Sequence, residues 1–317
     1  MTINLKCQIC GNDNDNKQLI ANEMMFGTRD EFQYLECGQC GCLQLIDVPE
    51  NLSTYYPPDY YSFQEEPGDI RSKVDSWIKK KVAIHRWKGS FIGKLLLPLH
   101  KRHLRWLGPD CGINKNSRIL DVGCGGGKLL KEMKHIGFRN LTGIDPYIES
   151  DIDLGDLPIL KRELHELDGE YDFIMFHHSF EHMIDPKVAL NNAVKLLAKD
   201  GSILIRVPVA DSYAYKTYGV NWVELDAPRH IFLHTVKSME SLVSACDMEI
   251  HAIRYDSSRF EIVGSEKHKR GIPSSDDTKI FSKEELTEID EQVDKLNENG
   301  EGGRACFYIK PVGQLPA

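Results

Sequence analysis

Residues 118–127, with the sequence RILDVGCGGG, decide the fold of this 317-residue chain. The apolar run from Ile119 to Val122 predicts a buried β-strand, and the alternate glycines that follow it allow a sharp turn. Residues 128–136 then carry a helical pattern that ends at Gly137, where a residue without a Cβ commonly terminates a helix. A strand, a glycine-rich turn and a helix in this order predict the first unit of an α/β domain.

The chain beyond this unit alternates between apolar runs and helical patterns. Further strands are predicted at 141–145, 159–160, 172–176, 202–207, 249–255 and 305–309. Helices are predicted at 186–197, 235–246 and 282–296, with a turn of the chain at Asp200-Gly201. Seven strands joined by crossover helices predict an α/β fold with a Rossmann-like, doubly wound and mostly parallel sheet.

The turn at Gly123, Gly125 and Gly127 is the expected ligand site, because ligands of doubly wound sheets bind beyond the carboxyl ends of the strands. Asp145 ends the second predicted strand 22 residues after Gly123, where a carboxylate is placed to accept hydrogen bonds from ribose hydroxyls. A lone glycine motif could serve only a tight turn, but here a strand, a helix and an acid accompany it. Dinucleotide sites favour GxGxxG, whereas this loop has Asp121 before a GxGxG run.

Five segments carry a resemblance to a known family: ILDVGCGGGKLL (119–130), LTGIDP (141–146), FHHSFEHMIDP (176–186), GSILIRVP (201–208) and LDAPRHIFLHT (225–235). Together they resemble class I methyltransferases that use S-adenosylmethionine (SAM), in particular bacterial enzymes with an N-terminal cysteine-rich segment that modify sugars and surface polysaccharides. The resemblance implies that the methionine portion of SAM lies beside residues 121–127, the ribose at Asp145, and the sulfonium near His177 and His178. The expected cofactor-binding residues are Asp121, Gly123, Cys124, Gly125, Gly127, Asp145 and His177.

Four cysteines near the N-terminus form two pairs with the spacing of metal ligands, Cys7-x-x-Cys10 and Cys37-x-x-Cys40. Two such pairs predict a tetrahedral zinc site, and a site closed by four thiolates is structural. Free cysteines in a small core are the alternative. We expect residues 1–48 to form a zinc-ribbon-like module, which the resemblance suggests helps to cover the active site.

Methyl transfer to a hydroxyl needs a base for the proton, and histidine suits this role near neutral pH. His230 ranks first and His178 second, because His230 lies in a tyrosine-rich loop where class I enzymes usually build the acceptor pocket. A capping or packing role is the alternative for each. Glu181-His182 is expected to orient the loop after the fourth strand. Related sugar C-methyltransferases carry an acid at the position of Arg229, so this chain favours O-methylation over C-methylation.

Residues 49–110 are expected to form an aromatic connector and basic amphipathic helices in the lid or substrate region, followed by the SAM-binding domain at 111–317. Tyr55–Tyr61 are candidate lid residues. Pro98 is expected to kink or divide the helices.

The basic residues of these helices indicate an anionic partner. Between Arg71 and Arg105 there are eleven Lys and Arg residues against one acid, although the chain as a whole has a net charge of −9. We expect either a phosphate-bearing acceptor or peripheral contact with anionic lipid through 71–107, with a solvated helix face as the alternative.

The sequence therefore predicts a SAM-dependent methyltransferase that acts on a sugar or glycan linked to a nucleotide or a lipid. The negative net charge argues against DNA as a partner and weakens the case for RNA. The N-terminus lacks the apolar core of a signal peptide, so we expect a cytoplasmic protein that could touch the inner membrane face. The alternatives are an RNA methyltransferase with a zinc ribbon, an NAD-dependent nucleotide-sugar oxidoreductase, and a non-catalytic module with a SAM-binding fold.

Overall fold

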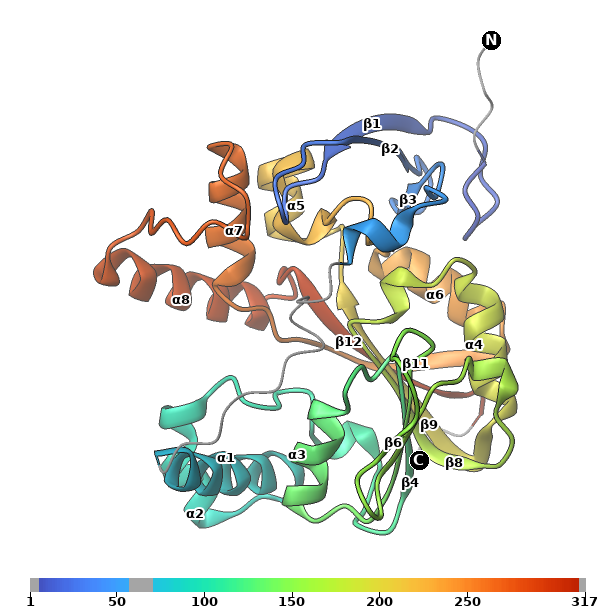
Figure 1. Ribbon diagram of the computed structural model, residues 1–317, viewed down its shortest axis with the longest axis vertical. Coiled ribbons are helices and arrows are strands. Elements are labelled where there is room, and N and C mark those ends of the chain that lie inside the picture. Colours follow the sequence, from blue (N-terminus) through green and yellow to red (C-terminus); the bar gives the residue numbers. More distant parts are fainter. Residues whose placement is uncertain (1–5, 57–70, 314–317) are drawn as a thin grey trace.

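A computed structural model describes residues 6–56 and 71–313 of the protein. Figure 1 shows a central twisted sheet with helices on both faces and a smaller sheet beyond one end of it. The central sheet has eight strands in the order β11-β12-β9-β8-β4-β5-β7-β6. Their bounds are β4 Arg118–Val122, β5 Asn140–Ile144, β6 Ile152–Asp153, β7 Pro158–Leu160, β8 Tyr171–His177, β9 Leu197–Pro208, β11 Met248–Tyr255 and β12 Arg304–Pro311.

The middle of the sheet is parallel and both of its edges contain antiparallel pairs. β4 pairs in parallel with β5 and β8, and β7 and β9 continue this direction on either side. β12 runs antiparallel between β9 and β11, and β6 runs antiparallel to β7. All seven predicted strands are present, and the two-residue β6 is an addition. The sheet is mixed because the last strand inserts antiparallel beside β9.

The helices α3, α4, α6 and α8 begin and end close to the predicted positions, whereas α5 and α7 were not predicted. Their bounds are α1 Arg71–Lys88, α2 Phe91–Leu96, α3 Lys128–Ile136, α4 Pro186–Lys195, α5 Tyr213–Tyr218, α6 Val236–Ser244, α7 Phe260–Lys269 and α8 Lys283–Glu298. Local signals set several ends: the Asp185 side chain caps α4, and Ser282 with Glu285 forms a capping box at α8. None of the helices in the described ranges is long and apolar enough to cross a membrane.

Each face of the sheet packs against its own set of helices. Along β8, Phe173 and Met175 face the core shared with α1 and α3, whereas Ile174 and Phe176 face the core shared with α4 and α6. Successive side chains of a strand point to opposite faces, so a continuous apolar run is what a strand buried on both sides requires. The two layers of helices therefore leave the carboxyl ends of the parallel strands as the place for a site.

Two local predictions are wrong. Asp200-Gly201 does not turn the chain: β9 runs from Leu197 through these residues, and its register against β8 shifts just before Ser202. Pro98 does not divide the basic helices. The division falls at Gly89, which has φ +70°, and Ser90 then caps α2, while Pro98 lies at the start of the short 3₁₀ helix η3 (Leu97–His100).

The smaller sheet joins the N-terminal segment to a distant part of the chain. It has the order β1-β2-β3-β10, with bounds β1 Lys17–Asn22, β2 Glu31–Glu36, β3 Leu43–Leu45 and β10 Phe232–Leu233. β10 pairs antiparallel with β3, Phe232 opposite Gln44 and Leu233 opposite Leu43. Its core mixes the N-terminal cysteines with Trp222 and neighbouring residues of the loop after β9. The cysteine module and this loop thus share one core.

Gly143 on β5 provides a test of the packing beneath the glycine loop. A Cβ at this position would lie 2.5 Å from Cys124 Sγ, 2.7 Å from Ile159 Cδ1 and 2.8 Å from Leu130 Cδ1. We expect Gly143→Ala to lower the free energy of unfolding by about 1–3 kcal/mol, because overpacking a filled core forces its neighbours apart. Chemical denaturation measures this.

Gly126→Ala is the matched control, because a Cβ there meets nothing within 4 Å and its φ lies outside the left-handed region. We expect it to change stability by less than about 0.5 kcal/mol. Equal effects of the two substitutions would contradict the packing described here.

Candidate active site

The loop between β4 and α3 forms a backbone cradle. Gly123, Gly125 and Gly127 have φ values of +74°, +52° and +73°, which side chains with a Cβ rarely adopt. A Cβ on Gly123 would lie 2.5 Å from the side chain of Ser179. The Gly123 and Cys124 amides both donate to the Ile144 carbonyl, at 2.8 and 3.1 Å, which holds the loop against the end of β5.

Two carboxylates flank this cradle in different states. Asp145, directly after β5, accepts the Gly125 amide through Oδ2 and the Tyr147 amide through Oδ1, both at 2.9 Å. Asp121 lies on β4, is buried, and its Oδ1 has no hydrogen-bond partner among the described residues. Burial and the nearby Asp145 charge raise the pKa of Asp121 to about 8. An orphaned buried carboxyl beside a glycine cradle indicates a site for a positively charged group.

Four polar side chains lie together beyond the end of β8: His178, Glu181, His182 and His230. His178 has φ +52°, an uncommon value for a residue with a Cβ, and such backbone strain is often found at functional sites. Its Nδ1 lies 3.5 Å from Glu181 Oε1. His230 Nε2 approaches the same oxygen at 4.0 Å, and the rings of His182 and His230 are 4.8 Å apart. Residues predicted separately therefore lie together.

Hydrogen bonds at Nδ1 fix the tautomers of His182 and His230. His230 Nδ1 lies 2.6 Å from the Glu224 carbonyl, and His182 Nδ1 lies 2.8 Å from the Arg229 carbonyl and 3.1 Å from the Tyr56 hydroxyl. A carbonyl can only accept, so Nδ1 of each ring carries the hydrogen. The Nε2 atom of His230 is therefore available as an acceptor, and it faces Asp226 Oδ2 at 3.9 Å and Glu181 Oε1 at 4.0 Å.

Glu181 is fully buried and neither of its carboxyl oxygens has a hydrogen-bond partner among the described residues. Burial raises its pKa to about 7, even though the adjacent His230 works in the opposite direction. Burial also lowers the pKa of His182 to about 3 and places that of His178 well below its ordinary range, with help from the charges of Arg206 and Arg304. A carboxyl group that titrates near neutrality beside a free imidazole nitrogen is suited to proton transfer.

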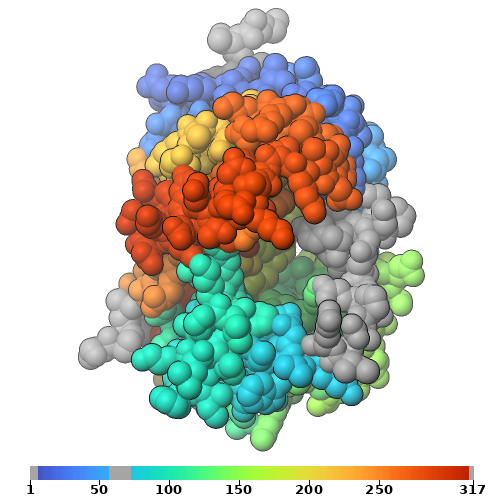
Figure 2. All heavy atoms as spheres, turned by 90° about the vertical axis from the view of Figure 1, so that its left-hand side faces the viewer, coloured from blue at the N-terminus to red at the C-terminus, as the bar shows by residue number. Residues whose placement is uncertain are grey.

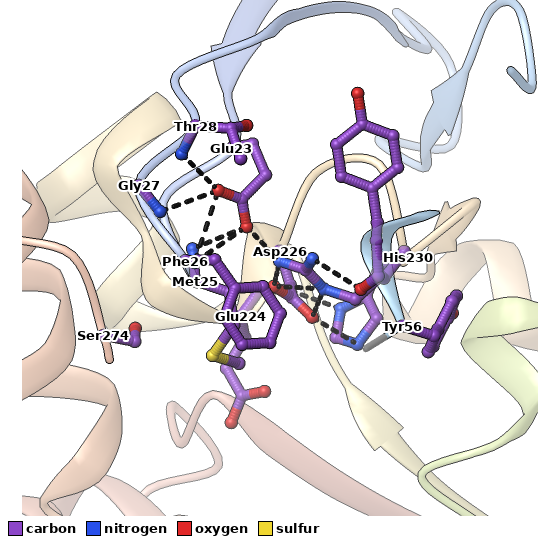
Figure 3. Close-up of polar contacts among 12 residues, drawn as sticks. Glu23, Met25, Phe26, Gly27, Thr28, Tyr56, Glu224, Asp226, His230 and Ser274 are labelled. Carbon is purple, nitrogen blue, oxygen red and sulfur yellow. Dashed lines mark hydrogen bonds and ion pairs between the residues drawn. The ribbon is translucent and has the colours of Figure 1, made fainter. Parts of the chain in front are cut away.

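Arg229 fixes the loop that carries His230. Its two acidic partners, Glu23 and Asp226, are labelled beside His230 in Figure 3. Its fully buried guanidinium lies 2.6 Å from Asp226 Oδ1 and 2.8 Å from Glu23 Oε1, and it donates to the Tyr55 carbonyl at 3.1 Å. Burial alone would raise the pKa of Asp226, but the Arg229 charge outweighs it and holds the pKa below its usual value.

Glu23 is in turn held by its own turn of the chain. Its carboxylate accepts backbone N–H groups from residues 25–28, at 2.8–3.3 Å. The Arg229 guanidinium therefore takes no direct part in the histidine cluster, to which this residue contributes only the carbonyl that binds His182. It connects the cysteine module to the loop on which His230 lies.

A second group of buried charges borders the histidines. Arg206 Nε donates to Asp256 Oδ2 at 2.8 Å, and Arg304 lies 3.7 Å from the Glu224 carboxylate. Arg304 Nε and Asp256 Oδ1 have no hydrogen-bond partner in the described part of the chain. Glu261 also belongs to this group, and burial and the Glu224 charge raise its pKa to about 8. Buried polar atoms left without partners suit a ligand with several polar groups.

The four predicted metal ligands lie together at the N-terminal module. Cys7 Sγ and Cys40 Sγ are 3.7 Å apart, Cys10 Sγ and Cys37 Sγ are 3.6 Å apart, and all four atoms lie within 4.8 Å of one another. These distances exclude disulfides, and a tetrahedron of sulfurs around zinc has edges of about 3.8 Å. The cluster is thus compatible with a zinc module, and Thr235 at the start of α6 holds it by donating to the Cys40 carbonyl at 2.5 Å.

A family model of the methyltransferase domain matches residues 94–253, about half of the chain. The chain belongs to this methyltransferase family. The match includes β4, the glycine loop and His230, and the strand order around β4 is that of a class I methyltransferase fold. This is the predicted fold and enzyme class, and it sets aside the oxidoreductase and the non-catalytic module.

Relatives in other organisms carry a more specific name. The ubiquinone biosynthesis O-methyltransferase of Bordetella avium is 29% identical over 182 residues, covering 52% of this chain and 74% of that protein. The protein of the same name from Pseudomonas aeruginosa is 25% identical over 191 residues, covering 51% and 76%. Among solved structures, a SAM-dependent methyltransferase from Archaeoglobus fulgidus is 19% identical and covers 71% of this chain and 96% of that one, with a TM-score of 0.41.

The cradle of this methyltransferase fits SAM. Asp145 retains acceptor capacity for the ribose hydroxyls, and the orphaned Asp121 Oδ1 offers a partner for a cationic group. Gly125 and Gly127 leave the backbone open to close approach. Cys124 contributes its backbone, since its Sγ packs against Gly143 below the loop. The assignment of these residues to SAM remains a prediction.

His177, the remaining predicted cofactor residue, ends β8 and is half-buried. Its ring centroid lies 4.6 Å from that of Trp106, and its Nε2 has no partner among the described residues. Burial places its pKa well below the ordinary value, so the ring is neutral. His177 thus contacts the basic segment, residues 71–107, through Trp106. Its role in cofactor binding stays a prediction.

Sequence reasoning missed Glu23 and understated Glu181. Glu23 lies 206 residues from Arg229, and no local pattern connects the two. A signal for Glu181 was available, because an acid between two histidines at a strand end is unusual in a buried segment. With His182 and His230 it also forms a group that could hold a divalent cation. Among the lid candidates, Tyr56 reaches His182, whereas residues 57–61 lie outside the described residues.

The raised pKa of Asp121 predicts how SAM affinity depends on pH. SAM carries positive charge, so it favours the ionised carboxylate, and binding below about pH 8 must release a proton. We expect the affinity of the wild-type protein to rise with pH up to about 8 relative to Asp121→Asn, by at most about tenfold per pH unit. Calorimetry from pH 6 to 9 measures both proteins.

Comparing two proteins at each pH isolates the carboxyl, because titration of SAM itself affects both equally. At pH 6 the two affinities should lie close together, and at pH 9 the wild-type protein should bind more tightly. Parallel profiles across this range would show that Asp121 does not contact the cofactor.

Proposed function

We propose that this methyltransferase transfers the methyl group of SAM to a hydroxyl oxygen of a sugar or glycan, with His230 as the general base. The observation that carries the proposal is the free Nε2 of His230, whose other nitrogen is fixed by the Glu224 carbonyl at 2.6 Å. A neutral histidine fixed in one tautomer can accept a proton from a hydroxyl in its reach. The names of the relatives, which are O-methyltransferases, support oxygen as the atom that is methylated.

SAM, when bound, supplies an electrophilic methyl group on its sulfonium sulfur. His230 Nε2 would take the proton of the acceptor hydroxyl while the oxygen bonds to the methyl carbon and the bond between that carbon and the sulfonium sulfur breaks, with its electron pair staying on the sulfur. Glu181 Oε1, 4.0 Å from that nitrogen, is near enough to stabilise the imidazolium that results. His178, 3.5 Å from the same oxygen, is the second candidate for the base.

The character of the neighbouring residues supports a polar acceptor. Charged groups lie near His178 and His230, and some of their atoms have no partner among the described residues. The group consists of Arg206, Arg304, Glu224, Glu261 and Asp256. Such a surface suits the hydroxyl, amino or phosphate groups of an activated sugar. It offers little apolar area for the ring of a quinone precursor, the acceptor that the names of the relatives would suggest.

We also propose that Cys7, Cys10, Cys37 and Cys40 bind one structural zinc ion. A site closed by four thiolates has no open position for a substrate, so the ion contributes to the fold of the module. Zinc binding would also stabilise the loop that carries His230. The Cys40 carbonyl accepts a hydrogen bond from Thr235 at the start of α6, and β3 pairs with β10.

Substitution of His230 tests the proposed base. We expect His230→Ala to reduce kcat about 10²–10⁴-fold, the usual loss of a general base, with the affinity for SAM unchanged. Glu181→Gln should reduce kcat less and remove a group with a pKa of about 7 from the acidic limb of the pH profile. His135→Ala, on the exposed side of α3, is the control and should be silent.

Labelled SAM with a panel of nucleotide sugars, glycans and prenylated phenols identifies the acceptor for these assays. Full turnover by His230→Ala would eliminate the base. Transfer to a prenylated phenol, or to RNA, with none to a carbohydrate would overturn the acceptor class and leave the base open to test.

Metal analysis tests the zinc proposal. We expect about one zinc per chain in the purified wild-type protein and a loss of metal in Cys37→Ser. Cys42→Ser is the control, since Cys42 is buried beside the cluster and belongs to neither pair. A wild-type protein free of zinc, or a Cys37→Ser protein with a full complement, would contradict the site.

A further inference from the structure

Helix α2 presents an apolar face to the outside of the molecule. Gly93 packs against α1 so closely that a Cβ would lie 2.5 Å from the His85 side chain, which turns the other face of α2 outward. That face carries Phe91 and Leu95, one helical turn apart, with 78% and 66% of their side chains exposed. Figure 1 shows α2 at the outer edge of the molecule, with α1 between it and α3.

The same apolar surface extends onto the neighbouring elements. Of fifteen large hydrophobic side chains exposed in the described part of the chain, six lie between residues 74 and 99. They are Val74 and Trp77 on α1, Phe91, Ile92 and Leu95 on α2, and Leu99 on η3. We call these six the apolar patch. A cluster of this kind on a protein surface marks an interaction site, whereas single exposed apolar residues do not.

Lysines without acidic partners in the described ranges lie on α1 and α2, the helices that carry most of the apolar patch. No ion pair is found for Lys80, Lys81, Lys88 or Lys94 within the described ranges, and the Lys81 ammonium lies 5.5 Å above the ring of Trp77. Asp75 is the one acid between residues 71 and 105, and it pairs with Lys79 and His100.

The basic residues that follow share two acids on α8, and Arg259 pairs with one of them as well. Lys101, Arg102 and Arg105 pair with Asp290 and Asp294 on α8. The four lysines of α1 and α2 named above, in contrast, have no ion pair in the described ranges, so unpaired positive charge lies on the two helices that carry most of the apolar patch.

We propose that this surface docks the methyltransferase on an anionic lipid bilayer. The apolar side chains would enter the boundary between headgroups and acyl chains, and the lysines would reach back to the phosphates with their ammonium groups. Anionic headgroups attract each lysine near the surface, which adds to the burial of the apolar patch. The proposal goes beyond the methyl-transfer reaction and is independent of the identity of the acceptor.

Charge complementarity favours a bilayer over other partners. A second copy of the chain docked by two-fold symmetry would place one cationic surface against another, which is unfavourable. RNA would satisfy the lysines but would leave the aliphatic side chains of Ile92, Leu95 and Leu99 uncovered. A bilayer of anionic lipid meets both kinds of group at once. Figure 2 shows the region in cyan at the lower end of the molecule, apart from the cysteine module at the top.

Vesicle flotation of the full-length protein tests this proposal. We expect at least tenfold stronger binding to vesicles of phosphatidylcholine with phosphatidylglycerol than to phosphatidylcholine alone. Phe91→Ser with Leu95→Ser should reduce binding to the anionic vesicles at least tenfold. Lys88→Glu with Lys94→Glu should reduce it similarly and weaken its dependence on salt.

The matched control is Ile184→Ser with Val188→Ser, which removes two exposed apolar side chains at α4 and should leave binding unchanged. Calorimetry with SAM, expected to be the same for all variants, shows that each is folded. Equal binding to neutral and anionic vesicles, or no effect of the patch variants, would overturn the proposal. A dimer that these variants convert to a monomer, without vesicle binding, would assign the surface to self-association instead.

Discussion

The structure depends on one buried guanidinium. Arg229 loses its hydration entirely, which costs several kcal/mol for an ion inside a protein, and its ion pairs with Asp226 and Glu23 and its hydrogen bond to the Tyr55 carbonyl offset that cost. Asp226 lies on its own loop, but Glu23 belongs to the cysteine module, so the arginine is satisfied only when the two parts are in place. The loop that presents His230 is therefore rigid only in the assembled protein.

The cofactor half of the site is built on a different principle. Its shape comes from backbone conformation at Gly123, Gly125 and Gly127 and from amides held by Ile144 and Asp145. These contacts are local to two adjacent strands and need no distant partner. The predicted cofactor cradle is thus defined by the α/β sheet alone, whereas the loop that carries His230 also depends on contacts with the N-terminal module.

This division explains what the sequence could predict. The strands, helices and cradle follow from patterns within about 30 residues, and capping residues such as Asp185 and Ser282 mark the helix ends. The sheet β1-β2-β3-β10 could not be predicted in this way, because β10 has two residues and forms through a partner nearly 190 positions away. Candidates for the base were found, but their grouping around Glu181 depends on tertiary contacts. The role of Arg229 was missed because its second partner lies in the other part of the chain.

The pairing of β10 with β3 bears on how such enzymes can diverge. The N-terminal module shares a sheet and a core with the loop that carries His230. It therefore cannot be exchanged alone between proteins, because the protein that supplies the module would also have to supply a loop of matching register. Substitutions that change acceptor preference should therefore occur together in the N-terminal module and in the loop that carries β10. Among related proteins, sequence changes in the N-terminal segment should correlate more strongly with changes at residues 222–235 than with changes in the glycine loop.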